Sequence, residues 1–207
     1  MNFGKRLNAV EEKPAEQINK PKSSNDDENL DVERNENHIY FYTEVTKSSI
    51  LELNKNLKSV AADLIHTANI LEIPTPDVKL HINSPGGSLF DGLAAVDVVR
   101  KSKAPVHSII EGMAASAATL ISVMAHKRSI NKHSYMLIHQ LSSGMFGKYE
   151  EMIDDMQNNK ALMEMVKKIY LDRTKIPAKM LNEILKKDLY FDANQCLKYG
   201  LVDDIIE

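Results

Sequence analysis

The sequence predicts an α/β protein built on a parallel sheet. Residues 78–83 and 105–110 have the apolar pattern of buried strands, and each is followed by a loop of small residues and a helical segment. Two βα units in succession are typical of a parallel sheet. The chain has 207 residues, of which 43% are hydrophobic, and this is enough for one domain with its own core.

The first 37 residues differ in composition from the rest of the chain. They hold 6 basic and 9 acidic residues, many Asn and Ser, and few large apolar side chains. Such a segment cannot bury enough apolar surface to offset the entropy lost on ordering, so we expect residues 1–37 to be a disordered polar tail. A propeptide, a partner-binding arm and a solubilising extension all fit this composition. The folded domain is expected over residues 38–207.

The domain is expected to begin with a strand and a helix. Residues 38–45 (HIYFYTEV) are alternating and aromatic, which favours a strand. Ser48 or Ser49 is expected to cap the helix that follows. Apolar residues recur along that helix at helical spacing: Ile50, Leu53, Leu57, Val60, Leu64, Ile65 and Ala68. After the strand at 78–83, a second helix is predicted over about residues 89–102.

The second βα unit and the C-terminal elements are predicted from the same signals of apolar periodicity and helix ends. A turn of small residues from Glu111 to Thr119 links the strand at 105–110 to a helix over 117–125. A long amphipathic helix is predicted over about residues 148–171. The other elements expected in this part are short strands at 127–131 and 135–139, a short helix after Pro177, a loop with Asp188, a helix from Asp192 to a Gly200 stop, and a last strand at 201–206.

Composition excludes several classes of protein. Cys196 is the only cysteine, so there is no disulfide framework or thiolate metal cluster, and we interpret it as a packing residue in a reducing compartment. No segment has the length of a signal peptide's apolar core or of a membrane span. A cytoplasmic protein is therefore expected. Beyond residue 37 the chain has 20 basic and 20 acidic residues, which gives no electrostatic signature of nucleic-acid binding.

Ser116 is a candidate nucleophile because of where the pattern places it. It lies at the junction of a predicted strand and helix, where unpaired N–H groups and the positive helix end favour an oxyanion. Close helix packing would explain the same run of Ala, Ser and Gly, and this stretch alone favours that interpretation. Gly86-Gly87 ends the neighbouring strand, and glycine there would let backbone N–H groups face a ligand.

A nucleophilic serine also needs a base and an orienting acid. Among the seven histidines, His139 ranks first because it ends an apolar strand and its side chain can leave the sheet. His81 and His107 lie within strands and are interpreted as structural. His38, His66, His126 and His133 are expected at the surface. The pattern does not choose among four candidate acids: Asp154, Asp172, Asp188 and Asp203.

Four motifs in order resemble the proteolytic subunit of the Clp protease. They are INSPGG (82–87), GMAAS (112–116), LIHQ (137–140) and YGLVDDII (199–206). By position, Ser116 resembles that family's nucleophile, His139 its general base and Asp188 its orienting acid, since Asp188 precedes the YGL segment by the family's interval. The backbone N–H groups of Gly87 and Ala117 match its oxyanion hole. The resemblance implies no metal and no cofactor.

The resemblance also implies a fold and an assembly. The family has a crotonase-like α/β fold and stacks two seven-membered rings into a tetradecamer that encloses the active sites. Its protruding handle region corresponds to about residues 140–174, with Gly144 and Gly147 as flexible glycines. The expected activity is that of a serine endopeptidase acting on peptides and unfolded proteins. An amphipathic helix rich in Met independently favours a partner surface or packing on its own core.

The chain departs from the family pattern at three places. Ala117-Ala118 replaces the usual Met-Gly, which a backbone donor tolerates. Lys79 and His81 stand where the family has aromatic residues that dock an ATP-driven unfoldase of the AAA+ class. The family's N-terminal axial-loop pattern is absent from the tail. An unfoldase partner is therefore an open question, and the chain has no nucleotide-binding GxxxxGK[ST] loop of its own.

Two other functions compete with a peptidase. A crotonase-type acyl-CoA hydratase or isomerase would use backbone N–H donors in the same loops, but it would not need Ser116, His139 and Asp188 together. A non-catalytic ring-forming scaffold would keep these residues and work by assembly. Binding of a nucleotide thioester would indicate the first, and failure to react with a serine-directed probe would indicate the second.

Overall fold

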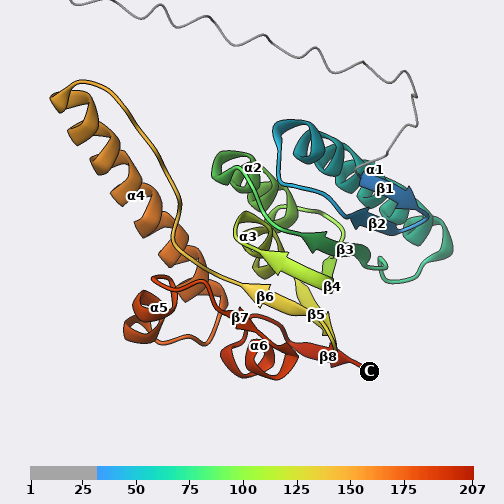
Figure 1. The fold of residues 1–207 in the computed structure, drawn as a ribbon. Coiled ribbons are helices and arrows are strands. Elements are labelled where there is room, and N and C mark those ends of the chain that lie inside the picture. Colours follow the sequence, from blue (N-terminus) through green and yellow to red (C-terminus); the bar gives the residue numbers. More distant parts are fainter. Residues whose placement is uncertain (1–31) are drawn as a thin grey trace, which may run out of the picture.

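The computed structural model describes residues 32–207, and these form one mixed sheet flanked by helices (Figure 1). The strand order is β1-β2-β3-β4-β5-β8, with β6 pairing both β4 and β7. The strands are β1 (Val32–Asn35), β2 (His38–Phe41), β3 (Val78–Ser84), β4 (Val106–Ala115), β5 (Lys127–Asn131), β6 (Tyr135–Leu137), β7 (Tyr190–Phe191) and β8 (Asp204–Ile206). The helices are α1 (Lys47–Leu71), α2 (Leu89–Arg100), α3 (Ala117–Val123), α4 (Tyr149–Arg173), α5 (Ala178–Ile184) and α6 (Ala193–Tyr199).

The predicted boundary of the tail was wrong at its C-terminal end. Residues 32–35 form β1, which pairs antiparallel with β2 so that Val32 faces Phe41. Both side chains are buried, and this packing outweighs the polar local composition. The rest of the predicted tail, residues 1–31, lies outside the described residues.

Most predicted elements are confirmed, although the strand predicted over residues 38–45 ends at Phe41 and the one predicted over 201–206 begins at Asp204. Two other differences have clear physical causes. Thr46 caps α1 in place of Ser48 or Ser49: the Ser49 N–H donates to Thr46 Oγ1 (3.2 Å) and the Thr46 N–H donates to Ser49 Oγ (3.0 Å). The start of the predicted small-residue turn continues β4 as far as Ala115. This extension exists because residues 113–115 pair with β6, a long-range partner that a local pattern cannot reveal.

The core lies between the sheet and helices α1, α2 and α3. Helix α1 packs on β1, β2 and β3, α3 packs on β3 and β4, and α2 contacts both of these helices. The side chains of Leu80, Ile110 and Leu120 are almost completely buried there. Because β3 and β4 run parallel, the loops that follow them emerge at the same end of the sheet. The Gly86-Gly87 loop and Ser116 are thereby brought to one edge.

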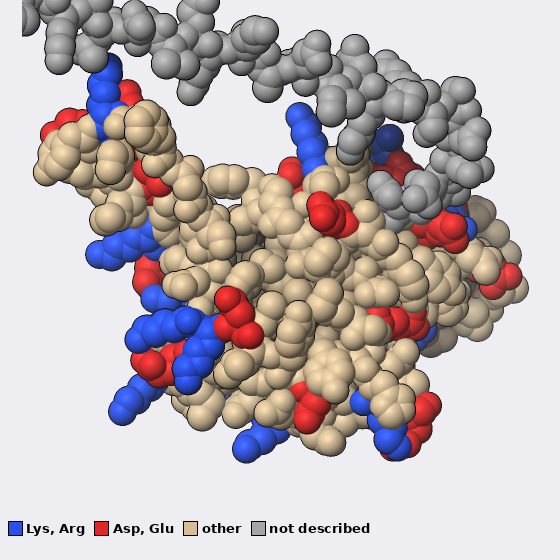
Figure 2. All heavy atoms as spheres, viewed as in Figure 1, with Lys and Arg blue, Asp and Glu red and all other residues tan. Residues whose placement is uncertain are grey.

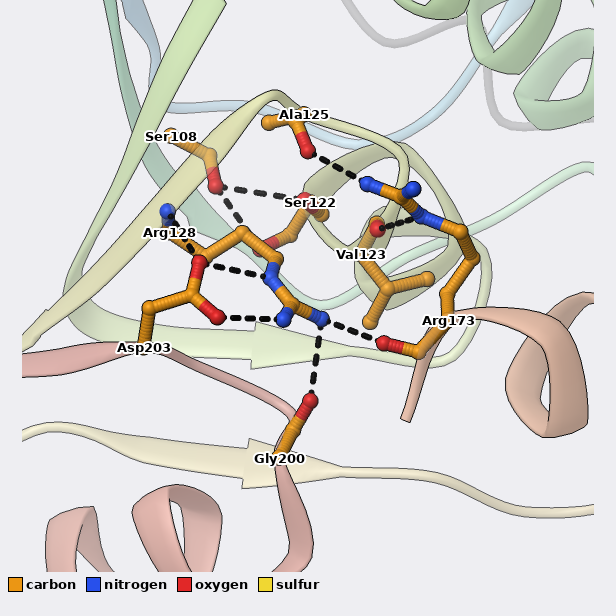
Figure 3. A network of polar contacts seen from close by, with 8 residues as sticks. All are labelled: Ser108, Ser122, Val123, Ala125, Arg128, Arg173, Gly200 and Asp203. Atoms are coloured by element: carbon orange, nitrogen blue, oxygen red, sulfur yellow. Dashed lines mark hydrogen bonds and ion pairs between the residues drawn. The ribbon is translucent and has the colours of Figure 1, made fainter. Parts of the chain in front are cut away.

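Helix α4 projects away from the sheet and its covering helices (Figure 1). Only Val166 and Tyr170 of its residues are buried, and both lie in its C-terminal third. The base of the helix is held by arginines (Figure 3): Arg173 donates to the carbonyls of Val123 (3.0 Å) and Ala125 (2.7 Å). Arg128 in turn donates to the carbonyl of Arg173 (2.6 Å). The base of α4 is thus fixed to the end of α3.

Charges of both signs are mixed on the face of the molecule that Figure 2 shows, with no broad area of one sign. None of the helices in residues 32–207 combines the length and the hydropathy needed to cross a membrane. Cys196 is fully buried, and this burial raises the pKa of its thiol to about 12. Its interpretation as a packing residue fits both facts, because the reactive form of cysteine is the thiolate.

Candidate active site

Ser116 lies between the last residue of β4 and the first residue of α3. Its backbone has φ 54° and ψ −126°, a conformation rare for a residue with a side chain. The conformation is held from both sides, because the Ser116 N–H donates to the carbonyl of Leu137 (2.9 Å) and the Ser116 carbonyl accepts from Thr119. Within residues 32–207 the Ser116 hydroxyl makes no hydrogen bond. It is left facing a cleft.

This cleft brings together four of the five predicted site residues. It has a volume of about 230 Å³ and lies where the β3–α2 loop, the start of α3, the segment after β6 and the base of α4 meet. Ser116, His139, Gly87 and Ala117 all line it. The remaining lining residues are mostly apolar: Ser88, Leu89, Leu120, Gln140, Leu141, Ser142, Val166 and Tyr170.

The fifth predicted residue, Asp188, contacts the cleft through His139. The distance from His139 Nδ1 to Asp188 Oδ1 is 2.8 Å. The antiparallel pairing of β6 with β7 explains this contact: Leu137 faces Tyr190, so continuing the register by two residues sets residue 139 opposite residue 188. Of the four aspartates left open by the sequence, Asp188 is the one that binds His139. A carboxylate accepting the Nδ1–H leaves Nε2 as the basic nitrogen.

The Gly86-Gly87 loop passes directly over Ser116. A Cβ on Gly86 would lie 2.5 Å from the carbonyl oxygen of Ala115 and 2.7 Å from Ser116 Cβ, so only glycine permits this approach. The loop is fixed to Val45, whose N–H donates to Gly86 O (2.7 Å) and whose carbonyl accepts from Ser88 (2.8 Å). These two bonds do not use the Gly87 N–H. The Ala117 N–H opens α3 and has no acceptor within the helix.

Three of the other six histidines, His38, His81 and His107, make polar contacts along β2, β3 and β4. His81 is 8% exposed and bonds His38 (2.8 Å) and Glu111 (2.9 Å), and Glu111 also accepts from Tyr42. His38 is therefore half-buried and bonded rather than at the surface as predicted. His107 lies between Lys79 Nζ (2.9 Å) and Ser129 Oγ (2.8 Å). Burial, reinforced by the charge of Lys79, lowers the pKa of His107 to about 4.

Sequence reasoning missed Thr119 and Tyr170. Thr119 Oγ1 donates to the carbonyl of Ser116 (2.6 Å) and also bonds the hydroxyl of Tyr170 (2.6 Å). Tyr170 was part of a predicted helix 54 residues away from Ser116, and no local pattern joins them. Only the packing of α4 on α3 brings these side chains together.

The fold has a clear counterpart among solved structures. A ClpP1 mutant from Listeria monocytogenes superposes with a TM-score of 0.71 over 83% of this chain and 91% of that one, at 20% sequence identity. The molecule is therefore a mixed α/β protein with the fold of a Clp proteolytic subunit.

Sequence comparison assigns the family. Residues 33–207 match the model of the Clp protease family. A Clp protease proteolytic subunit 2 from Parasynechococcus marenigrum is 30% identical over 179 residues, which cover 84% of this chain and 91% of that protein. A proteolytic subunit from Deinococcus radiodurans is 29% identical over 84% of this chain and 88% of its own. The chain belongs to the Clp protease family.

Proposed function

We propose that this chain is a serine endopeptidase of the Clp type, using Ser116, His139 and Asp188 as its catalytic triad. The observation that carries the proposal is the cleft itself: Ser116 and His139 line it together, and His139 is bound to Asp188 on its far side. Serine peptidases are recognised by this arrangement of nucleophile, base and acid rather than by sequence order.

The residues divide the chemistry among them. His139 Nε2 takes the proton of the Ser116 hydroxyl as the oxygen attacks the peptide carbonyl, and later gives that proton to the leaving amine. Asp188 keeps the proton of His139 on Nδ1 and stabilises the imidazolium that forms. The N–H groups of Gly87 and Ala117 donate to the oxyanion of the tetrahedral intermediate. Water then repeats the sequence on the acyl-enzyme and releases the second product.

The proposal includes an assembly of two stacked heptameric rings that enclose the active sites. Its support is helix α4, which leaves the body of the subunit and exposes Met152 and Met156, with Phe146 exposed in the segment just before it. Apolar side chains on a projecting helix need a partner surface. Enclosure would restrict substrates to peptides and unfolded chains.

The surface that would receive an unfoldase partner is polar in this chain. Lys79 and His81 stand at the positions of the family's docking aromatics. Lys79 bonds His107, and His81 bonds His38 and Glu111. A partner that docks through apolar side chains would have to bury these polar groups, which is unfavourable. We therefore propose that this subunit either works unaided or takes a partner with polar docking groups.

The test is labelling of the purified full-length chain by a fluorophosphonate probe, read by intact mass. We expect one adduct per chain in the wild type and none in Ser116→Ala, because the probe reacts with an activated serine. Ser142→Ala is a matched control, since it removes another hydroxyl that lines the same cleft. Wild-type and Ser142→Ala chains should also cleave a fluorogenic peptide, which Ser116→Ala should not.

The competing functions predict other results. Full cleavage or labelling in Ser116→Ala would refute the assignment of the nucleophile. Assembled rings that never react with the probe would favour the non-catalytic scaffold. The match to the Clp protease model favours a peptidase over a crotonase-type acyl-CoA enzyme.

A further inference from the structure

A pair of buried hydroxyls supports the backbone of Ser116. Thr119 is fully buried and Tyr170 is 1% exposed. Thr119 Oγ1 donates its single proton to the Ser116 carbonyl (2.6 Å), so at 2.6 Å from the Tyr170 oxygen it must accept the tyrosine proton. Burial raises the pKa of Tyr170, which keeps this hydroxyl protonated as a donor. The chain of hydrogen bonds runs from Tyr170 through Thr119 to the peptide that follows Ser116.

Residues of helix α4 therefore form hydrogen bonds near both ends of α3. Tyr170 reaches Thr119 in the first turn of α3, and Arg173, one turn further along α4, bonds the carbonyls of Val123 and Ala125 at the other end (Figure 3). Helix α3 has only seven residues and makes few hydrogen bonds of its own. Its position, and that of the strained Ser116 at its start, thus depends on these contacts.

We infer that Thr119 and Tyr170 are positioning residues for Ser116, through which the base of helix α4 holds the nucleophile in its reactive conformation. The inference rests on the proposed function only where it predicts a change in the rate of reaction at Ser116. The left-handed backbone of Ser116 is costly for a residue with a Cβ and persists only where the surroundings fix it. Two bonds from Thr119, through its N–H (3.0 Å) and its hydroxyl (2.6 Å), fix the carbonyl of Ser116.

Two variants remove the hydroxyls with little change in volume. In Thr119→Val we expect fluorophosphonate labelling to slow about tenfold, and in Tyr170→Phe about threefold, because small displacements of a nucleophile are costly. Peptide kcat should fall in parallel while KM stays within about twofold, since both hydroxyls are buried and bonded to each other. Thr119→Ser keeps the hydroxyl and should retain the wild-type rate. Tyr149→Phe, which removes an exposed hydroxyl from the same helix, is the matched control.

A second readout does not depend on activity. Amide hydrogen exchange of the segment 113–120 should become about fivefold faster in Tyr170→Phe and Thr119→Val, and stay unchanged in Tyr149→Phe. Wild-type rates of both labelling and exchange in the two variants would overturn the inference. Absence of labelling in the wild type would refute the proposed function instead, and the exchange rates would then decide the inference alone.

Discussion

Close packing and the proposed chemistry both bear on Ser116. Close packing against this residue needs a glycine at position 86, because a Cβ there would lie 2.5 Å from the Ala115 carbonyl oxygen and 2.7 Å from Ser116 Cβ. The same close approach brings the Gly86-Gly87 loop over the Ser116 side chain in the cleft. Packing and the proposed chemistry are therefore not alternatives at this position.

His107 gives a prediction about acid stability. Lys79 Nζ donates to His107 Nδ1, and Nε2–H donates to Ser129, so protonating the ring would set a second positive charge against Lys79. The folded-state pKa of about 4 lies below the ordinary value of 6.5. Between these values the unfolded chain binds more protons than the folded one, so stability falls as pH drops from about 6.5 to 4.

We expect the lowered pKa of His107 to account for about 1 to 2 kcal/mol of the free energy of unfolding lost on acidification. This is less than the full pKa shift corresponds to, because solvent screens part of the charge. Urea unfolding of wild type and His107→Gln, measured between pH 7 and pH 4.5, checks it. The free energy of unfolding should fall more steeply with acid in the wild type. Parallel curves for the two proteins would show that His107 does not carry the effect. His66→Gln, a substitution at an exposed site, is the control.

At the scale of elements, the C-terminal segments are joined by one arginine. Arg128, at the start of β5, binds both carboxylate oxygens of Asp203 and the carbonyls of Arg173 and Gly200 (Figure 3). Burial alone would raise the pKa of Asp203, but hydrogen bonds and the charge of Arg128 outweigh it, and the pKa is lowered. One guanidinium thus connects α4, α6 and the segment before β8.

Arg128→Lys is expected to lower the free energy of unfolding by about 1 to 3 kcal/mol. A lysine keeps the charge, but its ammonium group cannot donate to both oxygens of a carboxylate and to two carbonyls at the same time. Thermal and urea unfolding would measure the loss. Lys132→Arg is a suitable control, because the exposed pair of Lys132 with Glu207 is worth little. Equal stability of Arg128→Lys and wild type would contradict the role given to this network.

At the scale of the whole molecule, the apolar stripe of α4 is longer than the surface beneath it. Met163, Val166 and Tyr170 pack against the core, and the same face continues to Met156 and Met152, which are 73% and 50% exposed. A subunit on its own leaves this part of the stripe in solvent. Under the proposed function, a second ring covers it.

Met156→Glu should therefore separate stacked rings into single ones. Burying an unpaired carboxylate in such an interface costs about 3 kcal/mol or more, which exceeds what one contact contributes. Sedimentation velocity would report the change in particle mass. Asn158→Glu adds the same charge to an exposed position on the opposite face of the helix and should leave the assembly intact. Unchanged particles in Met156→Glu would exclude this stripe from the interface.

Local periodicity, caps and residue type were enough to predict the βα units, the helix stop at Gly200 and the candidate status of Ser116 and His139. Only the tertiary structure showed that β1 belongs to the sheet, that β4 runs on to Ala115, and that Asp188 binds His139. The last two depend on pairing between strands distant in sequence, and the first on a short hairpin within a segment of polar composition. The support of Ser116 by Tyr170 likewise arises from helix packing, which no local pattern encodes.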